Sequence, residues 1–127
     1  RKLEEKTIFI LVCGQKLAIR KRTEKGLLSG LWELPSQDGF LDEKQAEKCL
    51  ENWGLLVNSL EASVSSKHIF THIEWDMNAW IAKIERESTC FLWADAEQLK
   101  EKYTLPYAFK AYFKEIEKQL KSVDTRK

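Results

Sequence analysis

The sequence lacks a cysteine pattern of the kind that holds a metal or builds a disulfide framework. Its three cysteines, Cys13, Cys49 and Cys90, are an odd number, lie far apart and form no C-x-x-C pair. Structural zinc and iron–sulfur sites take closely spaced ligands, so neither is predicted here. We therefore expect no cofactor and no metal in this chain, and interpret the cysteines as buried free thiols in a reducing compartment.

Long apolar runs and a surplus of charge are also missing. No stretch approaches the roughly 20 apolar residues that a membrane-spanning helix needs, so no membrane partner is expected. The 21 Lys and Arg residues almost balance the 20 Asp and Glu residues, which leaves a formal net charge of +1. So small a charge gives the surface as a whole little attraction for DNA. Nucleic-acid binding would need locally clustered basic residues or a second domain.

Methionine is nearly absent, since Met77 is the one methionine in the chain. The first residue is Arg1 and not methionine. We expect from this start that the chain is a piece of a longer protein. Its 127 residues suit a single domain. We assign residues 1–6 to a linker remnant, residues 7–121 to the domain and residues 122–127 to a flexible C-terminal tail. A cytoplasmic, bacterial location is expected.

Several segments have the hydropathy pattern of β-strands. Residues 7–13 (TIFILVC) form an apolar run typical of a strand covered on both faces. A Gly14-Gln15 turn and the alternating residues 16–22 complete a hairpin. Shorter strands are predicted near residues 31–34, 55–65 and 91–93. Residues 67–84 alternate with a period of two over more than a dozen positions.

Three helices are predicted between and after these strands. Asp42 with Gln45 three residues later is a capping-box pair that begins the first helix, which ends at Gly54. A second helix begins after residue 95 in the same way, and a third begins at Thr104 and Pro106. Strands and helices in this order predict an α+β domain with a mixed sheet and covering helices.

The alternation breaks between His68 and His72. Thr71 occupies the phase that apolar residues take elsewhere, and Phe70 occupies the polar phase between the two histidines. A bulge, or a loop tip between two strands, would re-aim these side chains. The alternative is a regular strand with a surface aromatic beside a core threonine. Two histidines alone are too few ligands for a metal, so we favour a structural or hydrogen-bonding role for them.

Three blocks of sequence are similar to the C-terminal domain of MutY-type adenine DNA glycosylases. They are residues 25–35 (KGLLSGLWELP), residues 67–73 (KHIFTHI) followed by Trp75, and residues 103–108 (YTLPYA). The blocks occur in the order of that family and span nearly all of residues 7–121. The combination is specific, whereas one short block alone would be moderate evidence.

The resemblance implies an α+β, Nudix-like fold with a mixed β-sheet packed between helices. It implies a domain that recognises 8-oxoguanine opposite adenine in base excision repair and positions a separate catalytic domain. In this family the catalytic carboxylates and the 4Fe–4S cluster lie in that N-terminal domain, whose motifs this sequence lacks. We therefore expect no catalytic residue here. The expected partners are double-stranded DNA containing 8-oxoguanine opposite adenine and the N-terminal catalytic domain of the same parent.

The resemblance also indicates where the lesion is read. In the family a Phe-Ser-His loop reaches the lesion, and this chain has Phe70, Thr71 and His72 there, with His68 nearby. Threonine keeps the hydroxyl and adds a methyl. 8-Oxoguanine carries a hydrogen on N7 and an oxygen on C8, and a hydroxyl can accept and donate. We expect Thr71 to accept from N7–H, Phe70 to support the loop or pack beside the base, and the histidines to donate to phosphate.

Two further sets of residues are expected around this loop. The set assigned to the DNA backbone is basic, with a solvated surface as the alternative reading, and consists of Arg20, Lys21, Arg22 and Lys25. The set assigned to shaping the site has turn geometry and core packing as its alternative, and consists of Gly26, Ser29, Gly30 and Trp32.

A working Nudix hydrolase of a modified nucleoside triphosphate is the rival function. Such enzymes resemble one another at G-x5-E-x7-R-E-U-x-E-E-x-G-U, whose glutamates hold magnesium. Aligned on Gly54, the Arg-Glu pair becomes Glu47-Lys48 and the Glu-Glu pair becomes Glu51-Asn52. A lysine in place of a glutamate would repel the metal, and Gly39 lies too close to Gly54 for the full motif. A plain non-catalytic scaffold module is the third reading.

Overall fold

The computed structural model describes residues 1–23 and 25–121. The tail expected at residues 122–127 therefore lies outside the described residues. Eight strands form a single sheet with the order β3-β2-β1-β7-β5, while β4 pairs with β1, β6 with β7 and β8 with β2. The strands are β1 (Lys2–Cys13), β2 (Lys16–Lys21), β3 (Trp32–Glu33), β4 (Ser36–Asp38), β5 (Val57–Ala62), β6 (Ser66–Ile69), β7 (Ile73–Ile84) and β8 (Leu92–Ala94).

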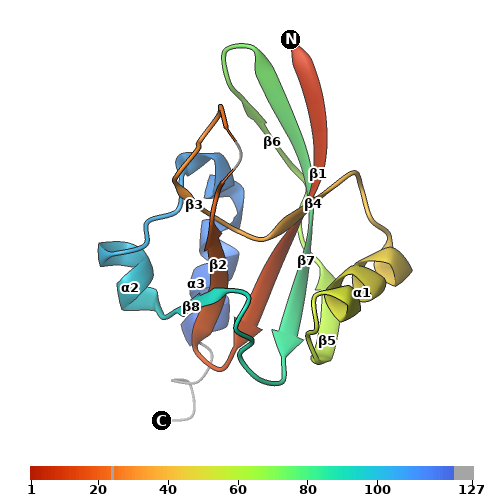
Figure 1. Ribbon diagram of the computed structural model, residues 1–127, viewed down its shortest axis with the longest axis vertical. Coiled ribbons are helices and arrows are strands. Elements are labelled where there is room, and N and C mark those ends of the chain that lie inside the picture. The colour runs from red at the N-terminus through yellow and green to blue at the C-terminus, as the bar shows by residue number, and fades with distance from the viewer. Residues whose placement is uncertain (24, 122–127) are drawn as a thin grey trace.

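The two longest strands, β1 and β7, form the centre of the sheet (Figure 1). They run parallel over eleven paired positions, from Lys2 opposite Ile73 to Val12 opposite Lys83. All the other strand pairs in the described residues are antiparallel, so the sheet is mixed. Parallel strands are normally covered on both faces, which agrees with the apolar run of residues 7–13.

The assignment of residues 1–6 to a linker is wrong, because residues 2–6 are the first half of β1. Because their side chains are mostly charged, these residues lack the apolar pattern by which a strand is recognised in a sequence. Their side chains have partners on the neighbouring strand β7. The Trp75 indole Nε1 donates to Glu4 Oε1 at 3.2 Å, and the Lys6 ammonium lies 5.0 Å from the centre of the Trp75 ring. Residues 2–6 therefore form a strand because they pair with β7, and not because of an apolar pattern in the local sequence.

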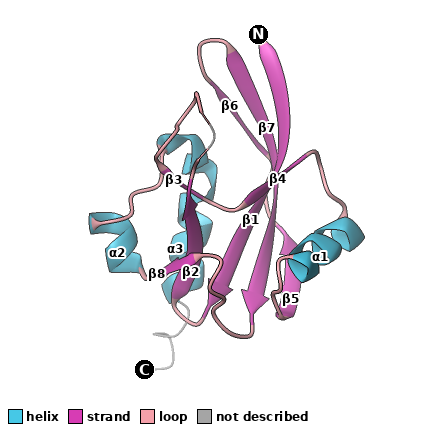
Figure 2. Cartoon of the chain, in the orientation of Figure 1, coloured by secondary structure: helices cyan, strands magenta, loops and turns pink. Residues whose placement is uncertain are grey.

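Helices cover both faces of this sheet, as the sequence predicts (Figure 2). α1 (Glu43–Asn52) and α2 (Ala96–Glu101) begin with capping boxes at Asp42 and Asp95, and both reciprocal hydrogen bonds of each box are formed. The third helix differs from the prediction, because it begins as a 3-10 helix, η1 (Tyr107–Tyr112), and becomes α-helical at α3 (Phe113–Lys121). No side-chain cap hydrogen bond precedes η1.

Two apolar cores lie on the two faces. The core on the α3 side includes Ile8, Trp75 and Tyr112, and the core on the α1 side includes Phe9 and Leu50. Ile8 and Phe9 lie on opposite faces of the sheet, and each face has its own core. Successive residues of β1 are therefore both buried, which explains why the run is continuously apolar. This arrangement confirms the α+β fold with a mixed sheet packed between helices.

None of the described helices is long and apolar enough to cross a membrane. All three cysteines are free, but Cys90 is exposed rather than buried and the other two are half-buried.

The upper part of β1 and the β6–β7 hairpin extend beyond the helices, which places the turn at residues 70–72 at one end of the molecule (Figure 1).

Candidate nucleic-acid interface

The irregularity at residues 68–72 is the tip of the β6–β7 hairpin and not a bulge. The Phe70 amide donates to the Ile73 carbonyl at 2.7 Å, which closes a tight turn. The Lys2 amide donates to the His72 carbonyl at 2.9 Å, which ties the turn to the start of β1. Because residues on either side of the turn belong to different strands, a single alternating phase cannot run through them.

Phe70 braces this tip from the core side. Its ring meets His68 edge-to-face at a centroid distance of 4.6 Å and meets Trp75 in the same manner at 5.1 Å. Trp75 is 1% exposed and belongs to the core on the α3 side, against which Phe70 packs. The alternative of a surface phenylalanine beside a core threonine is therefore wrong. Phe70 supports the loop, and His68 is half-buried against it.

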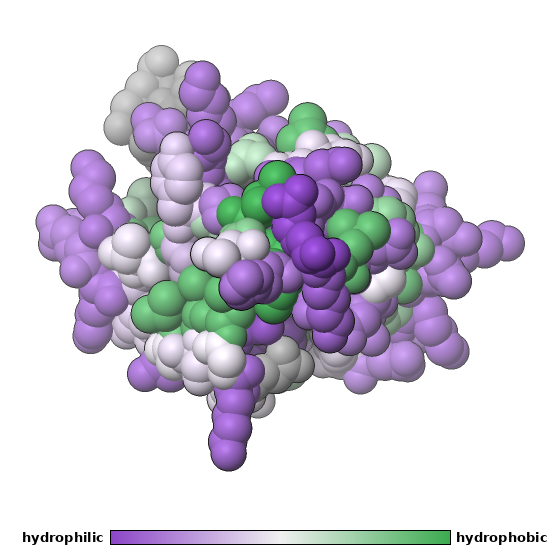
Figure 3. All heavy atoms as spheres, turned by 90° about the horizontal axis from the view of Figure 1, so that it is seen from above, coloured by the Kyte–Doolittle hydropathy of each residue, from purple (hydrophilic) through white to green (hydrophobic). Residues whose placement is uncertain are grey.

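Thr71 and His72 are exposed on the outer side of the tip. Within residues 1–23 and 25–121, the Thr71 hydroxyl has no hydrogen-bond partner, and the amides of Thr71 and His72 have no backbone acceptor. The tip thus offers one hydroxyl and two N–H groups to solvent on a turn that is held from both strands. Seen from above, this end of the molecule shows apolar atoms interspersed with hydrophilic side chains (Figure 3).

The two arginines expected at the DNA backbone are instead paired with a buried glutamate. Arg20 Nε donates to Glu33 Oε2 at 3.0 Å, and Arg22 Nη1 donates to Glu33 Oε1 at 3.1 Å. Arg22 also donates to the Leu27 carbonyl at 2.9 Å, and its guanidinium lies 5.3 Å from the Trp75 ring centre. The side chain of Arg22 is only 10% exposed, so the expectation that it contacts phosphate is wrong.

Sequence reasoning missed Glu33, although a signal was present. A lone carboxylate inside the apolar run of residues 31–35 needs a partner when buried, and β2 carries Arg20 directly opposite Glu33 in the register. Arg20 pairs with Glu33 across the β2–β3 ladder, and its side chain remains 35% exposed. Lys21 and Lys25, in contrast, are exposed and make no ion pair with another described residue.

Three of the residues expected to shape the site, Gly26, Ser29 and Gly30, lie in a loop that contacts Arg22, whereas Trp32 lies in β3. Gly26 and Gly30 have φ values of 99° and 80°, which non-glycine residues rarely adopt, so turn geometry requires glycine at both positions. The Gly30 amide donates to the Arg22 carbonyl at 2.8 Å, and Ser29 is exposed. Leu27 and Leu28 of this loop pack against the same core as Phe70. Trp32 is half-buried against that core as well.

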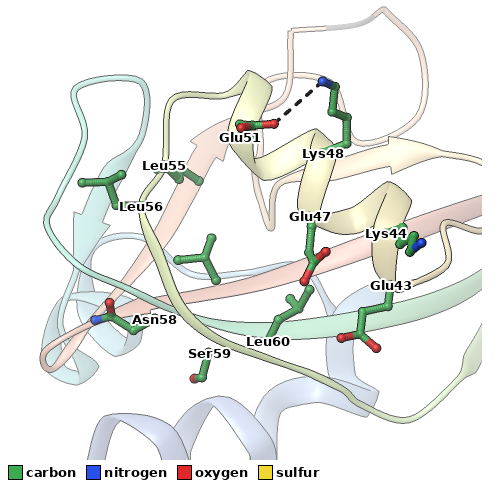
Figure 4. Close-up of a pocket in the computed structure, with 11 residues that line it drawn as sticks. Glu43, Lys44, Glu47, Lys48, Glu51, Leu55, Leu56, Asn58, Ser59 and Leu60 are labelled. Carbon is green, nitrogen blue, oxygen red and sulfur yellow. Dashed lines mark ion pairs between the residues drawn. The ribbon is translucent and has the colours of Figure 1, made fainter.

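The helix that would carry a Nudix metal site mixes lysines with its glutamates, and Lys48 forms an ion pair with Glu51 at 3.8 Å. Lys48 and Asn52, which stand where two glutamates would be, line a hollow of about 430 Å3 together with Gln37 and Cys49. The glutamates of α1 line a second hollow of about 710 Å3 between α1 and β5, together with Lys44 and Lys48 (Figure 4). In the described part of the chain, no group of three or more His, Cys, Asp or Glu side chains is arranged to hold a metal ion.

This fold and sequence define a known class of domain. The model of the NUDIX domain matches residues 7–115, so the chain belongs to the Nudix family. Among solved structures, the C-terminal domain of mouse MUTYH, crystallised with human PCNA, is similar with a TM-score of 0.70 and 19% identity. That match covers 90% of this chain and 87% of the MUTYH chain.

Nudix hydrolases share the fold to a similar degree. A MutT NUDIX hydrolase from Burkholderia pseudomallei has a TM-score of 0.66 at 15% identity, over 90% of this chain and 98% of that chain. A pyrophosphohydrolase from Bacillus subtilis has a TM-score of 0.61 at 18% identity, over 94% of this chain and 82% of that chain. At these identities the structural matches establish the fold alone, and the local chemistry must separate the functions.

Proposed function

We propose that this domain recognises 8-oxoguanine opposite adenine in DNA and serves an adenine DNA glycosylase whose catalytic machinery lies in another domain. The observation that carries the proposal is the Thr71 hydroxyl, which is exposed and has no hydrogen-bond partner among the described residues, at a turn that Phe70 braces against buried Trp75. A recognition group must be both accessible to the base and held in position, and this turn meets both requirements.

The hydrogen-bonding groups at the tip match the two atoms that oxidation changes. The Thr71 hydroxyl accepts from N7–H of 8-oxoguanine, and the free N–H groups of Thr71 and His72 can donate to O8. Guanine has no hydrogen on N7 and no O8, so neither the contact from N7–H nor the contacts to O8 can form. One well-formed base contact contributes about 1–3 kcal/mol of discrimination, which is about fivefold to 150-fold in affinity.

The geometry of α1 argues against hydrolysis of a nucleoside triphosphate as the main activity. Lys48 lies on the same hollow as Asn52, and its charge would oppose a divalent cation there. The hydrolase reading rests on the fold shared with MutT-type enzymes, whereas no group of acidic side chains in the described residues is arranged to hold the metal ion that hydrolysis needs. The parent's catalytic domain is the proposed protein partner of this chain, and the mouse MUTYH domain was itself crystallised with a protein, PCNA.

A paired binding and hydrolysis experiment tests this function. Fluorescence anisotropy would compare the affinity of the chain for matched duplexes with 8-oxoguanine or guanine opposite adenine, at low salt because the net charge is only +1. We expect at least about fivefold preference for the lesion. In parallel, 8-oxo-dGTP with Mg2+ should not be hydrolysed. Equal affinities with turnover of the triphosphate would favour the hydrolase, and equal affinities without turnover would favour a scaffold.

A further inference from the structure

Two exposed lysines are held against an aromatic pair at one edge of the sheet. The Lys21 ammonium lies 5.3 Å from the ring centre of Trp32, and that of Lys102 lies 5.4 Å from the ring centre of Tyr103. The two rings meet edge-to-face at 5.0 Å. The end of β2, the strand β3 and the end of α2 therefore bring lysine, tryptophan, tyrosine and lysine into one continuous row.

A third lysine–aromatic pair lies in η1. Tyr107 is 64% exposed, and the Lys110 ammonium lies 4.8 Å from the centre of its ring. Tyr107 is the first residue of η1 and follows Tyr103 by four residues in the chain. We refer to these three lysines and three rings as the lysine platform: Lys21, Trp32, Lys102, Tyr103, Tyr107 and Lys110.

The charges of the lysine platform are not neutralised by carboxylates. Lys21, Lys102 and Lys110 take part in no ion pair between described residues, whereas Glu33 binds both Arg20 and Arg22. An aromatic face restrains an ammonium group without cancelling its charge. Each platform lysine is thus partly oriented in advance and still carries a full positive charge toward solvent. Such groups suit phosphate, which a lysine binds as a point charge.

We propose that the lysine platform binds the sugar–phosphate backbone of a DNA duplex beside the lesion. The choice of DNA rests on the proposed function, since a net charge of +1 leaves duplex binding dependent on locally unpaired cations. The platform supplies those cations, and its Trp32 packs on the same core as Phe70 of the hairpin tip. Arg20 and Arg22 brace the fold through Glu33, and the lysines contact phosphate.

The salt dependence of duplex binding tests the platform. Lys21→Ala combined with Lys102→Ala should lower the slope of log affinity against log salt by about 1.8, at about 0.9 for each lost phosphate contact. The matched control is Lys44→Ala combined with Lys118→Ala, which changes net charge equally at exposed lysines that contact no ring or carboxylate of the described residues. The control should keep the parental slope. Lys21→Arg with Lys102→Arg should restore it.

Each result bears on the platform separately from lesion reading. A platform variant that weakens both duplexes equally, while the ratio between 8-oxoguanine and guanine stays unchanged, supports the proposal. The proposal is overturned if the slopes fall equally in the platform and control variants. It is also overturned if the unsubstituted chain does not bind the duplex. Binding to a polyglutamate peptide instead of DNA would also overturn it. Loss of the lesion preference alone would refute the proposed function and leave the platform standing. Matching thermal unfolding of all variants confirms that they are folded.

Discussion

Removing the charge of Glu33 should destabilise the domain more than removing a charge from an exposed ion pair does. Glu33 is 6% exposed and accepts from two guanidinium groups, at 3.0 Å from Arg20 and 3.1 Å from Arg22. Arginine stays protonated in proteins, so Glu33→Gln leaves the buried Arg22 with a charge that it cannot lose. Breaking one partner of a buried pair costs about 3–5 kcal/mol. The lower end applies here, because Arg22 keeps the Leu27 carbonyl and the Trp75 ring.

Urea unfolding followed by tryptophan fluorescence measures this loss. We expect a decrease of about 3 kcal/mol in the free energy of unfolding, out of the roughly 5–15 kcal/mol of a typical domain. The control is Glu51→Gln, whose ion pair with Lys48 at 3.8 Å is exposed and should contribute no more than about 1 kcal/mol. Equal losses for the two variants would refute the view that the Glu33 pair braces β2 and β3.

Two further variants test the brace of the hairpin tip and the burial of a tyrosine. Phe70→Ala removes two edge-to-face contacts, so we expect a loss of about 1–3 kcal/mol in urea unfolding and a weaker preference for 8-oxoguanine; an unchanged preference would show that the turn needs no brace. Burial raises the pKa of Tyr112 to about 12, above the value near 10 of an unfolded chain. The resulting stability is therefore fully present below pH 10 and is lost as pH rises toward 12, and Tyr112→Phe should abolish this part of the decline in alkaline unfolding curves. A decline of the same size in the Phe variant would contradict the assignment.

Local sequence signals predicted those parts of the fold that local physics determines. The capping boxes at Asp42 and Asp95, the Gly14-Gln15 hairpin and the doubly covered strand all appear as predicted. Each depends on hydrogen bonds or alternation within a few residues. The first half of β1 was missed, because its stability comes from pairing with β7 about 70 residues later in the chain.

In the candidate site, too, local sequence predicted some features and could not predict those that depend on distant residues. The break in alternation located the turn at residues 70–72, and the structure confirms that Phe70 and Thr71 exchange the exposures that a regular strand would give them. The burial of Arg22 could not be predicted from β2 alone, since its partner Glu33 arrives on another strand. Lys21 was expected at the DNA backbone, but its grouping with Lys102 could not be predicted, because the two lysines reach one surface through the contact of Trp32 with Tyr103.

The central claim is that the Thr71 hydroxyl senses the proton that oxidation places on N7. The most direct measurement is the ratio of affinities for 8-oxoguanine and guanine duplexes in Thr71→Val, Thr71→Ser and the control Thr89→Val, whose threonine is exposed on the loop between β7 and β8. The account predicts that Thr71→Val lowers the ratio at least about fivefold, whereas Thr71→Ser and Thr89→Val retain it. A Thr71→Val variant with the parental ratio would contradict the account.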